Sequence, residues 1–513
     1  MAYLNMPISV SGGLVADLPA VDLENNQFST IHNLRLKSGR LTPVQGHSRV
    51  FDPPPINPEH VRGLIQNETP EIYVAGSGKL YKNTNGLWED VTRTSGGNYA
   101  IDAGWSSTAL NSCLYFNNES DRLQVKEVAD ADFKDSVNLP ANFKAKTFRG
   151  FKNYLFALNI EESGQSLPLS LRWSDPADVG VEPPSWDVTD PTTQAGQLAL
   201  ADTDGEIVDA SQLRDQLIIY KTDSVYSCQF IGGIYVFAFA KIFEDRGMLT
   251  RECVSQFEGK HFVVDFDDIY IHDGIQDSSI ADKRVKDLFF RSLNQDFYQN
   301  VFTVSNPEEK EIWICYPDDN SVNGSCNAAL IWNWVYNTWS TRDLPNLAHA
   351  TTAIVDPKAD EVWNTGKDVS WDLGSLHWDA NAYSPANSSV VMASKEDIAI
   401  YQVDNSSLFD GQTYEWVLEK LSASLGDLTK VKYLNSMTPN IAGEGNISIR
   451  VGSQYNSGDG VSWKTPTTYS VGKFRHYLRG QGRYISFRLS GDSGTALPLI
   501  ESFTIQYTTE GGK

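Results

Sequence analysis

The strongest constraint on the fold is a strand pattern that recurs along most of the chain. In each copy, a run of β-branched and aromatic residues is followed by a polar or glycine turn, a second such run and often a tryptophan. The copies lie at residues 72–88, 113–116, 154–186, 216–226, 261–274 and 311–334. Because one small antiparallel sheet cannot bury both faces alone, this recurrence, at roughly 40 to 55 residues, predicts the blades of a β-propeller.

The predicted architecture is all-β, with a propeller followed by a small C-terminal β-sandwich. We expect residues 60–410 to form about six to eight blades, with seven favoured, and residues 411–513 to form the sandwich. Residues 1–59 are expected to form an extended N-terminal arm and the first strands. No WD or kelch signature marks the repeat, so a large irregular sandwich is the alternative fold.

Local patterns define these boundaries. Pro53–Pro55 and Pro58 predict a stiff spacer, since proline fixes φ and removes a donor. Residues 446–451 and 483–489 alternate apolar and polar side chains, as strands with one wet face do. In contrast, residues 280–297 repeat apolar side chains at helical spacing, so we expect one helix against or between the blades.

The cysteines and histidines give no sign of a metal site. Five cysteines form no CxxC pair and are odd in number, which argues against a zinc cluster and a disulfide framework. His32, His60 and His377 lack HxxxH or HxH companions. We therefore predict reduced, mostly buried thiols, no metal-binding residues and no cofactor.

The charge of the chain is strongly acidic and unevenly distributed. Residues 415–513 hold 11 Lys/Arg and 8 Asp/Glu, a net of +3; of the totals of 42 and 65, this leaves 31 and 57, a net of −26, for residues 1–414. Such a surface repels phosphate, which argues against sequence-specific nucleic-acid binding. It favours either solubility or a channel wall that DNA passes without adhering.

Two local motifs resemble chemical sites and have simpler explanations. Residues 75–79 (AGSGK) suggest a phosphate-binding loop, but the first glycine and the Ser/Thr after the lysine are absent, so a hairpin turn is favoured. Asp265, Asp267 and Asp268 lie near His272 and Asp273 and could serve acid–base chemistry or bind calcium. Turns between strands also prefer aspartate, and this is the favoured interpretation.

No motif predicts catalysis. Residues 457–463 (SGDGVSW) resemble the Asp-box turn of sialidase propellers, but the motif departs by one residue and occurs once. Glycosidases need two carboxylates facing each other in a pocket, and the sequence places no such pair. There is no GxSxG nucleophile elbow. We predict that the protein is not an enzyme, with no catalytic and no cofactor-binding residues.

Read end to end, the chain resembles the tail hub or nozzle proteins of short-tailed bacteriophages, also called packaged-DNA stabilisation proteins. The resemblance rests on the order and spacing of segments and covers nearly the whole chain. The segments are Gly12–Leu14, Asn33–Leu41, Gly78–Lys82, Arg172–Pro176, Leu213–Lys221, Ile269–Gly274, Trp334–Ser340, Arg450–Ser453 and Gly482–Arg488.

The resemblance implies a structural protein of the virion tail, assembled in the bacterial host cytoplasm. It implies a homohexamer around an axial channel, in contact with portal and adaptor proteins and with tail fibre, spike or needle proteins. Such a hub retains packaged DNA and conducts it during ejection, through transient and non-specific passage. We expect no stable membrane insertion, because no apolar run approaches roughly 18 residues. The alternative is a tail-associated propeller that binds or hydrolyses glycans.

Overall fold

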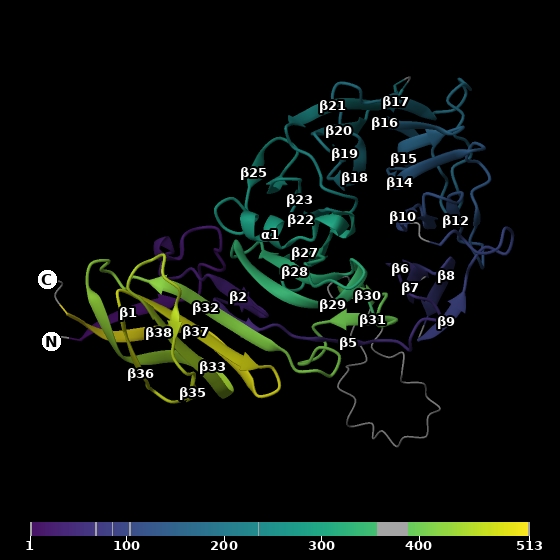
Figure 1. Cartoon of the computed structure of the whole chain (residues 1–513). Helices are drawn as coiled ribbons and strands as arrows, with labels where there is room; N and C mark the ends of the chain where they lie inside the picture. Colours follow the sequence, from purple (N-terminus) through teal and green to yellow (C-terminus); the bar gives the residue numbers. More distant parts are fainter. Residues whose placement is uncertain are drawn as a thin grey trace, which may run out of the picture.

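The computed structural model describes residues 3–66, 69–84, 86–101, 104–233, 235–355 and 388–510. Over these residues it contains 38 strands, one α-helix and two short 3-10 helices. A ring of small sheets lies beside a second β-module, at whose far end both termini are found (Figure 1). The predicted all-β fold, a propeller followed by a β-sandwich, is confirmed.

Five blades are separate four-stranded antiparallel sheets, each built from consecutive strands. The first blade is β6 (His60–Gln66), β7 (Thr69–Gly76), β8 (Lys79–Thr84) and β9 (Leu87–Asp90), and the second is β10 (Ser106–Leu110), β11 (Cys113–Asn117), β12 (Gln124–Lys126) and β13 (Lys134–Asp135). The third is β14 (Phe143–Phe151), β15 (Tyr154–Glu162), β16 (Gln165–Trp173) and β17 (Gly196–Ala199), and the fourth is β18 (Ile207–Leu213), β19 (Gln216–Lys221), β20 (Ser224–Phe230) and β21 (Phe237–Glu244). The fifth is β22 (Val254–Phe257), β23 (Lys260–Val264), β24 (Ile269–His272) and β25 (Asp277–Ser279).

Two further blades share one long strand. The sixth is β26 (Phe302–Asn306), β27 (Glu311–Tyr316), β28 (Cys326–Asn333) and the first part of β29 (Thr338–Ala353). The later part of β29 begins the seventh blade, which continues through β30 (Ser389–Ser394) and β31 (Ala399–Val403). Its fourth strand is β5 (His47–Arg49), from the N-terminal part of the chain. The described residues therefore form seven four-stranded blades.

The recurring aromatic and β-branched residues fill the spaces between neighbouring blades. Tyr115 of the second blade and Phe148 of the third pack in one apolar cluster with Trp186, which is 1% exposed. Equivalent clusters lie between the other pairs of neighbouring blades, including the seventh and the first. Since each blade buries both faces against its neighbours, the repeat in the sequence is a repeat of these contacts.

The second module is a sandwich of two sheets around an apolar core that contains Met437, Phe487 and Phe503. Its strands are β32 (Glu415–Ala423), β33 (Val431–Gln454), β34 (Ser462–Trp463), β35 (Thr467–Ser470), β36 (His476–Gly482), β37 (Tyr484–Asp492) and β38 (Ala496–Glu510). Strand β33 pairs with β36 and β38 along its first part and with β35 and β37 along its second. It therefore passes from one sheet to the other.

The N-terminal segment joins both modules. Strand β1 (Leu4–Ser9) pairs with β38, and β4 (Arg40–Pro43) pairs with β3 (Leu34–Lys37) and touches β38. Strand β2 (Thr30–His32) pairs with β32 of the sandwich and also with β29 of the propeller. The stretch expected to be an arm thus contributes one strand to the last blade and links the two modules through backbone hydrogen bonds.

At Gly46, the N-terminal segment packs closely against the backbone of Leu408. A Cβ at this position would lie 1.9 Å from the carbonyl oxygen of Leu408, so only glycine allows the chain to pass here. The Gly46 amide donates to the Ser406 carbonyl, and the Gly46 carbonyl accepts from Asp404. These contacts hold the chain in place immediately before β5.

The predicted helix at residues 280–297 is shorter than expected. The structure has α1 (Lys286–Ser292) and then the 3-10 helix η2 (Gln295–Asn300); the other 3-10 helix, η1 (Ala20–Asp22), lies in the N-terminal segment. Lys283 has a φ of 59°, and Leu293 is extended, so neither continues the α-helix. The carboxylate of Asp17, from the N-terminal segment, accepts hydrogen bonds from the first turn of α1.

A buried ionic group fixes the N-terminal hairpin onto the sixth and seventh blades. Arg35 on β3 is 3% exposed. Its guanidinium donates to both oxygens of Glu311, at 2.8 and 3.0 Å, and to both oxygens of Asp404, at 3.0 and 3.1 Å. Removing one member of such a group leaves the others charged and buried without compensation.

We expect Arg35→Leu to lower the free energy of unfolding by about 3–5 kcal/mol, because Glu311 and Asp404 lose their shared cation. The matched control is Arg40→Leu on the same hairpin, whose partly exposed pair with Glu501 should contribute about 1 kcal/mol or less. Urea unfolding at pH 7.5 measures both. Equal losses for the two variants would contradict the importance of the buried group.

Candidate functional site at the propeller axis

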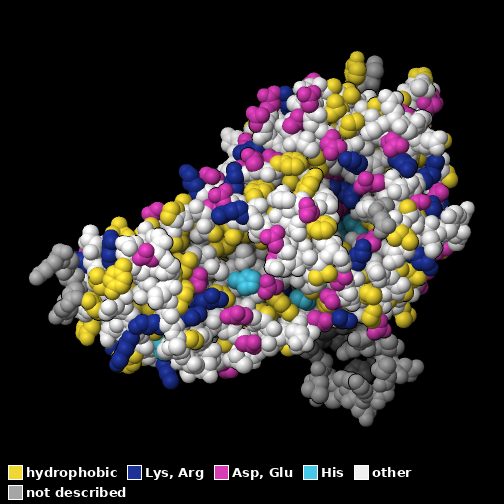
Figure 2. Space-filling model, viewed as in Figure 1, with side chains coloured by type: hydrophobic (Ala, Val, Ile, Leu, Met, Phe, Trp, Pro, Cys, Tyr) yellow, Lys and Arg dark blue, Asp and Glu magenta, His cyan; other side chains and the backbone are white. Residues whose placement is uncertain are grey.

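A cavity of about 700 Å³ opens at one face of the propeller axis. Residues at or just before the first strands of several blades line it, together with turns inside the blades. Figure 2, viewed as in Figure 1, shows a hollow near the centre of the ring, with Lys or Arg and His side chains at its wall. The cavity is thus part of the propeller architecture and does not arise from a single loop.

Every blade contributes at least one side chain to the axial region. Successive members of this axial ring are separated by intervals such as the 42 residues from Ser107 to Arg149 and the 60 residues from Arg149 to Asp209. Its members in chain order are His60, Ser107, Arg149, Asp209, Glu252, Phe302 and His349. The ring therefore has the same periodicity as the blades.

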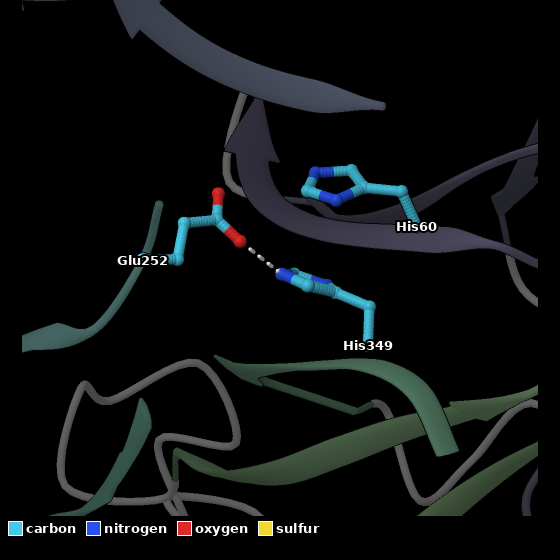
Figure 3. A group of neighbouring side chains, drawn as sticks. All are labelled: His60, Glu252 and His349. Atoms are coloured by element: carbon cyan, nitrogen blue, oxygen red, sulfur yellow. Dashed lines mark hydrogen bonds and ion pairs between the residues drawn. The ribbon is translucent and has the colours of Figure 1, made fainter. Parts of the chain in front are cut away.

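Three members form the base of the cavity. His60 begins β6, Glu252 lies two residues before β22, and His349 lies in the later part of β29. Nε2 of His349 is 2.7 Å from Oε2 of Glu252, and the two imidazole centroids are 4.0 Å apart. Figure 3 shows these side chains approaching one another from three separate elements.

Neighbouring groups hold the three side chains in place. Ser107 Oγ is 2.8 Å from Nε2 of His60, and the Val61 amide donates to Nδ1 of His349 at 3.3 Å. Arg149 makes two 2.7 Å hydrogen bonds to Asp209, and its Nη2 lies 3.5 Å from Oε1 of Glu252. Polar contacts therefore fix the base of the cavity: Ser107, Val61 and Arg149 contact the three side chains directly, and Asp209 in turn holds Arg149.

The electrostatics of the site follow from its burial. Burial and the neighbouring His349 hold the pKa of His60 well below its ordinary value. Burial alone would raise the pKa of Glu252, but His349, His60 and Arg149 outweigh it and keep that pKa well below the usual range. At neutral pH the base of the cavity contains a neutral imidazole at His60 and an ionised carboxylate at Glu252.

The rim of the cavity carries ion pairs and aromatic side chains. Lys146 pairs with Glu206 at 2.9 Å, Arg251 with Glu119 at 2.8 Å and Lys395 with Glu59 at 3.1 Å, each pair joining two blades or their connections. Phe266 and Tyr298 also line the cavity and are 46% and 40% exposed. The rim therefore presents ion pairs, in which positive and negative charges balance, and exposed aromatic side chains.

The aspartates near His272 belong to turns and to an ion pair. Asp265 accepts from the Gly247 and Phe266 amides, and Asp273 accepts from the Ile275 and Gln276 amides. Asp268 pairs with Arg246 at 3.0 Å, and Asp267 is exposed. His272 is 1% exposed and shares the Tyr220 hydroxyl with His261. None of these aspartates lines the axial cavity, and neither does His272.

The motifs that resemble a phosphate-binding loop and an Asp box both form turns. Ser77 and Gly78 form the two-residue turn between β7 and β8, with φ of 48° and 75°, as a hairpin requires. Asp459 accepts from the Asn456 amide in the turn after β33. All five cysteines are buried and free. His32 pairs with Asp343, and His377 lies outside the described residues.

Sequence reasoning missed Glu252 and His349 and treated His60 as isolated. These residues are 192 and 97 positions apart, so no local motif connects them. The available signal was their equivalent place, at or just before the first strand of the first, fifth and seventh blades. That signal requires the blade boundaries to be known within a few residues.

No protein-family model matches the chain, and a search of curated proteins finds no match. Among solved structures, the chain is similar to one in "Crystal Structure of Mitotic Checkpoint Complex", with a TM-score of 0.39 and 10% identity over 69% of this chain and 96% of that one. It is also similar to YCF48 bound to a D1 peptide, with a TM-score of 0.34 and 11% identity over 57% of this chain and 83% of that one.

A third similar structure is PorZ, described as a surface component of the type-IX secretion system of Porphyromonas gingivalis. The TM-score is 0.36 and the identity 9%, over 83% of this chain and 46% of PorZ, so the chain spans less than half the length of PorZ. None of these similarities transfers a function. Separately, none of the helices in the described segments has the length and apolar character needed to cross a bilayer.

We expect the axial histidine to make folding stability depend on pH. Since the folded pKa of His60 is far below its ordinary 6.5, unfolding takes up a proton below that pH, and stability falls as pH decreases from 6.5. His60→Gln should make the free energy of unfolding less dependent on pH between 6.5 and 5, by up to about 1.4 kcal/mol per pH unit.

Urea titrations at several pH values, in buffer containing a chelator, measure this slope. The other buried histidines titrate in both proteins and cancel in the comparison. Identical slopes for the wild type and His60→Gln would show that His60 protonates as readily in the folded chain as in the unfolded one.

Proposed function

We propose that this protein is a structural subunit of the tail hub, or nozzle, of a short-tailed bacteriophage. One observation carries the proposal beyond the sequence resemblance. Strand β2 is hydrogen-bonded to β32 of the sandwich on one side and to β29 of the propeller on the other. The propeller and the sandwich are thereby joined through strand pairing as well as by a linker.

A rigid two-module subunit suits a ring that must hold internal pressure. Domains connected by a flexible linker move relative to one another unless their interface is large and hydrophobic. Here the buried Arg35 group and an apolar cluster that spans blades and sandwich support the strand pairing. In the proposed homohexamer, such subunits would transmit load between neighbours without changing shape.

The propeller axis is an unsuitable path for DNA. Side chains from all seven blades occupy the axial region. His60 and Asp209 are buried there, and His60 and Arg149 are hydrogen-bonded to neighbouring side chains, as in a packed interior. A duplex would have to pass between subunits, through the channel at the centre of the ring. The proposal therefore assigns the conducting surface to the outside of the propeller or sandwich.

The charge distribution supports this arrangement. Residues 1–414 carry a net charge of −26, and an acidic channel wall would limit phosphate contacts that slow transit. Lys and Arg side chains gather at the sandwich end of the molecule, whereas both signs are interspersed over the propeller (Figure 2). The sandwich is our candidate for contact with a more acidic portal or adaptor ring, since opposite charges accelerate docking.

The second candidate function is glycan binding at the axial cavity. The observation that favours it is the rim, where exposed Phe266 and Tyr298 line the same cavity as carboxylates such as Glu59 and Glu206. Exposed rings and carboxylates can stack on sugars and accept hydrogen bonds from their hydroxyls. A glycan array with the wild type and Phe266→Ala distinguishes this candidate, since a hub subunit should bind no glycan through the cavity.

The hub proposal predicts that heads assembled without this protein package DNA and then lose it. Packaging occurs through the portal before the tail is added, so the missing subunit would leave the channel unsealed. DNase-resistant genome copies per head, measured with and without complementation in the phage that encodes the chain, test this. Complementation with Asp267→Asn, a change at an exposed turn, should restore the wild-type value.

Particles that lack the protein, retain their genome and infect normally would overturn the hub proposal. If particles that lack the protein instead retained their genome but no longer bound host glycans, the glycan-binding function would replace it.

A further inference from the structure

The axial region brings two imidazoles and a carboxylate together. The Glu252–His349 hydrogen bond needs only one imidazole, yet His60 lies against His349 with its ring tilted by 32°. The ligand-type atoms of His60, Glu252 and His349 all lie within 4.8 Å of one another. Two imidazoles and a carboxylate from three distant parts of the chain thus meet at the base of an open cavity.

We propose that His60, Glu252 and His349 bind a divalent transition-metal ion, with zinc as the best fit, at the base of the axial cavity. Two histidines and one glutamate form a zinc ligand set that leaves a coordination position open for water. Calcium and magnesium prefer oxygen ligands, so a site with two imidazole nitrogens fits these ions poorly. Here the open position would face the cavity.

The surrounding contacts resemble those that orient metal ligands. Ser107 contacts Nε2 of His60, which leaves Nδ1 of that ring without a hydrogen-bond partner among the described residues. The Glu252 amide donates to Asp209 at 3.0 Å, and Asp209 is itself held by Arg149. Such outer contacts fix the direction of ligands before the ion arrives.

Binding requires a defined rearrangement of protons. Because Nδ1 of His349 accepts from the Val61 amide, Nε2 carries a proton and donates it to Glu252. To coordinate through Nε2, the ring must move its proton to Nδ1 and give up the Val61 hydrogen bond, which is long at 3.3 Å. The metal then takes the place of the proton between His349 and Glu252.

The ion would connect blades that are far apart in sequence. Its ligands belong to the first, fifth and seventh blades, and the first and seventh meet at the point where the ring closes. A ligand that binds only the folded chain stabilises it, so metal should raise the melting temperature. This inference does not depend on the proposed tail function.

The test uses the full chain after dialysis against a chelator. Calorimetric titration with ZnCl₂ should show about one ion per chain, and the melting temperature should rise. Glu252→Gln and His349→Gln should each weaken zinc binding by at least about tenfold. His32→Gln is the matched control, because His32 also contacts a carboxylate, Asp343, but no second imidazole lies beside it within the described segments.

Two results would overturn the inference. One is a wild-type chain that binds no zinc; the other is equal binding by the wild type, His349→Gln and His32→Gln, which would indicate non-specific surface binding. If the axial variants fail to fold, the absorption spectrum of Co²⁺ bound to the wild type decides. Intense bands of a four- or five-coordinate site support the axial ligand set, and the weak spectrum of hydrated Co²⁺ contradicts it.

Discussion

The pairing of residues 30–49 with strands hundreds of positions away is the constraint on which the rest of the structure depends. Strand β2 joins β29 to β32, and β5 supplies the fourth strand of the seventh blade. Without β5 the last blade would end in an unpaired edge, and without β2 the modules would lose their shared backbone hydrogen bonds. The buried Arg35 group fixes the same segment through its side chains.

Polar and apolar side chains have separate roles in this propeller. Apolar clusters lie between the blades and hold the ring together, whereas the axial ring satisfies its polar groups largely within itself. The cavity lies above the axial ring. In the proposed hub, the outer surfaces are left for subunit contacts and DNA. Because the axial cavity and the outer surfaces are separate parts of the molecule, the hub proposal and the axial metal proposal can be tested independently.

The sequence predicts features that depend on neighbouring residues and fails where distant residues meet. The blades and the Ser77-Gly78 turn follow from local alternation and from the backbone freedom of glycine. The length of the helix was overestimated, because the spacing of apolar residues does not reveal that Leu293 is extended. The meeting of Glu252 with His349 could not be predicted, since it depends on the register of two blades and leaves no local pattern.

Hydrogen exchange measured by mass spectrometry on the intact chain tests the central claim most directly. If residues 30–49 unite the propeller and the sandwich, their backbone amides should exchange only through global unfolding, as slowly as those of core strands such as β19 and β37. Peptides covering β2 and β5 would then share one protection level with both modules. Rapid exchange in residues 30–49, with the two modules still protected, would show that the segment is a loosely attached arm and that the subunit is not one rigid body.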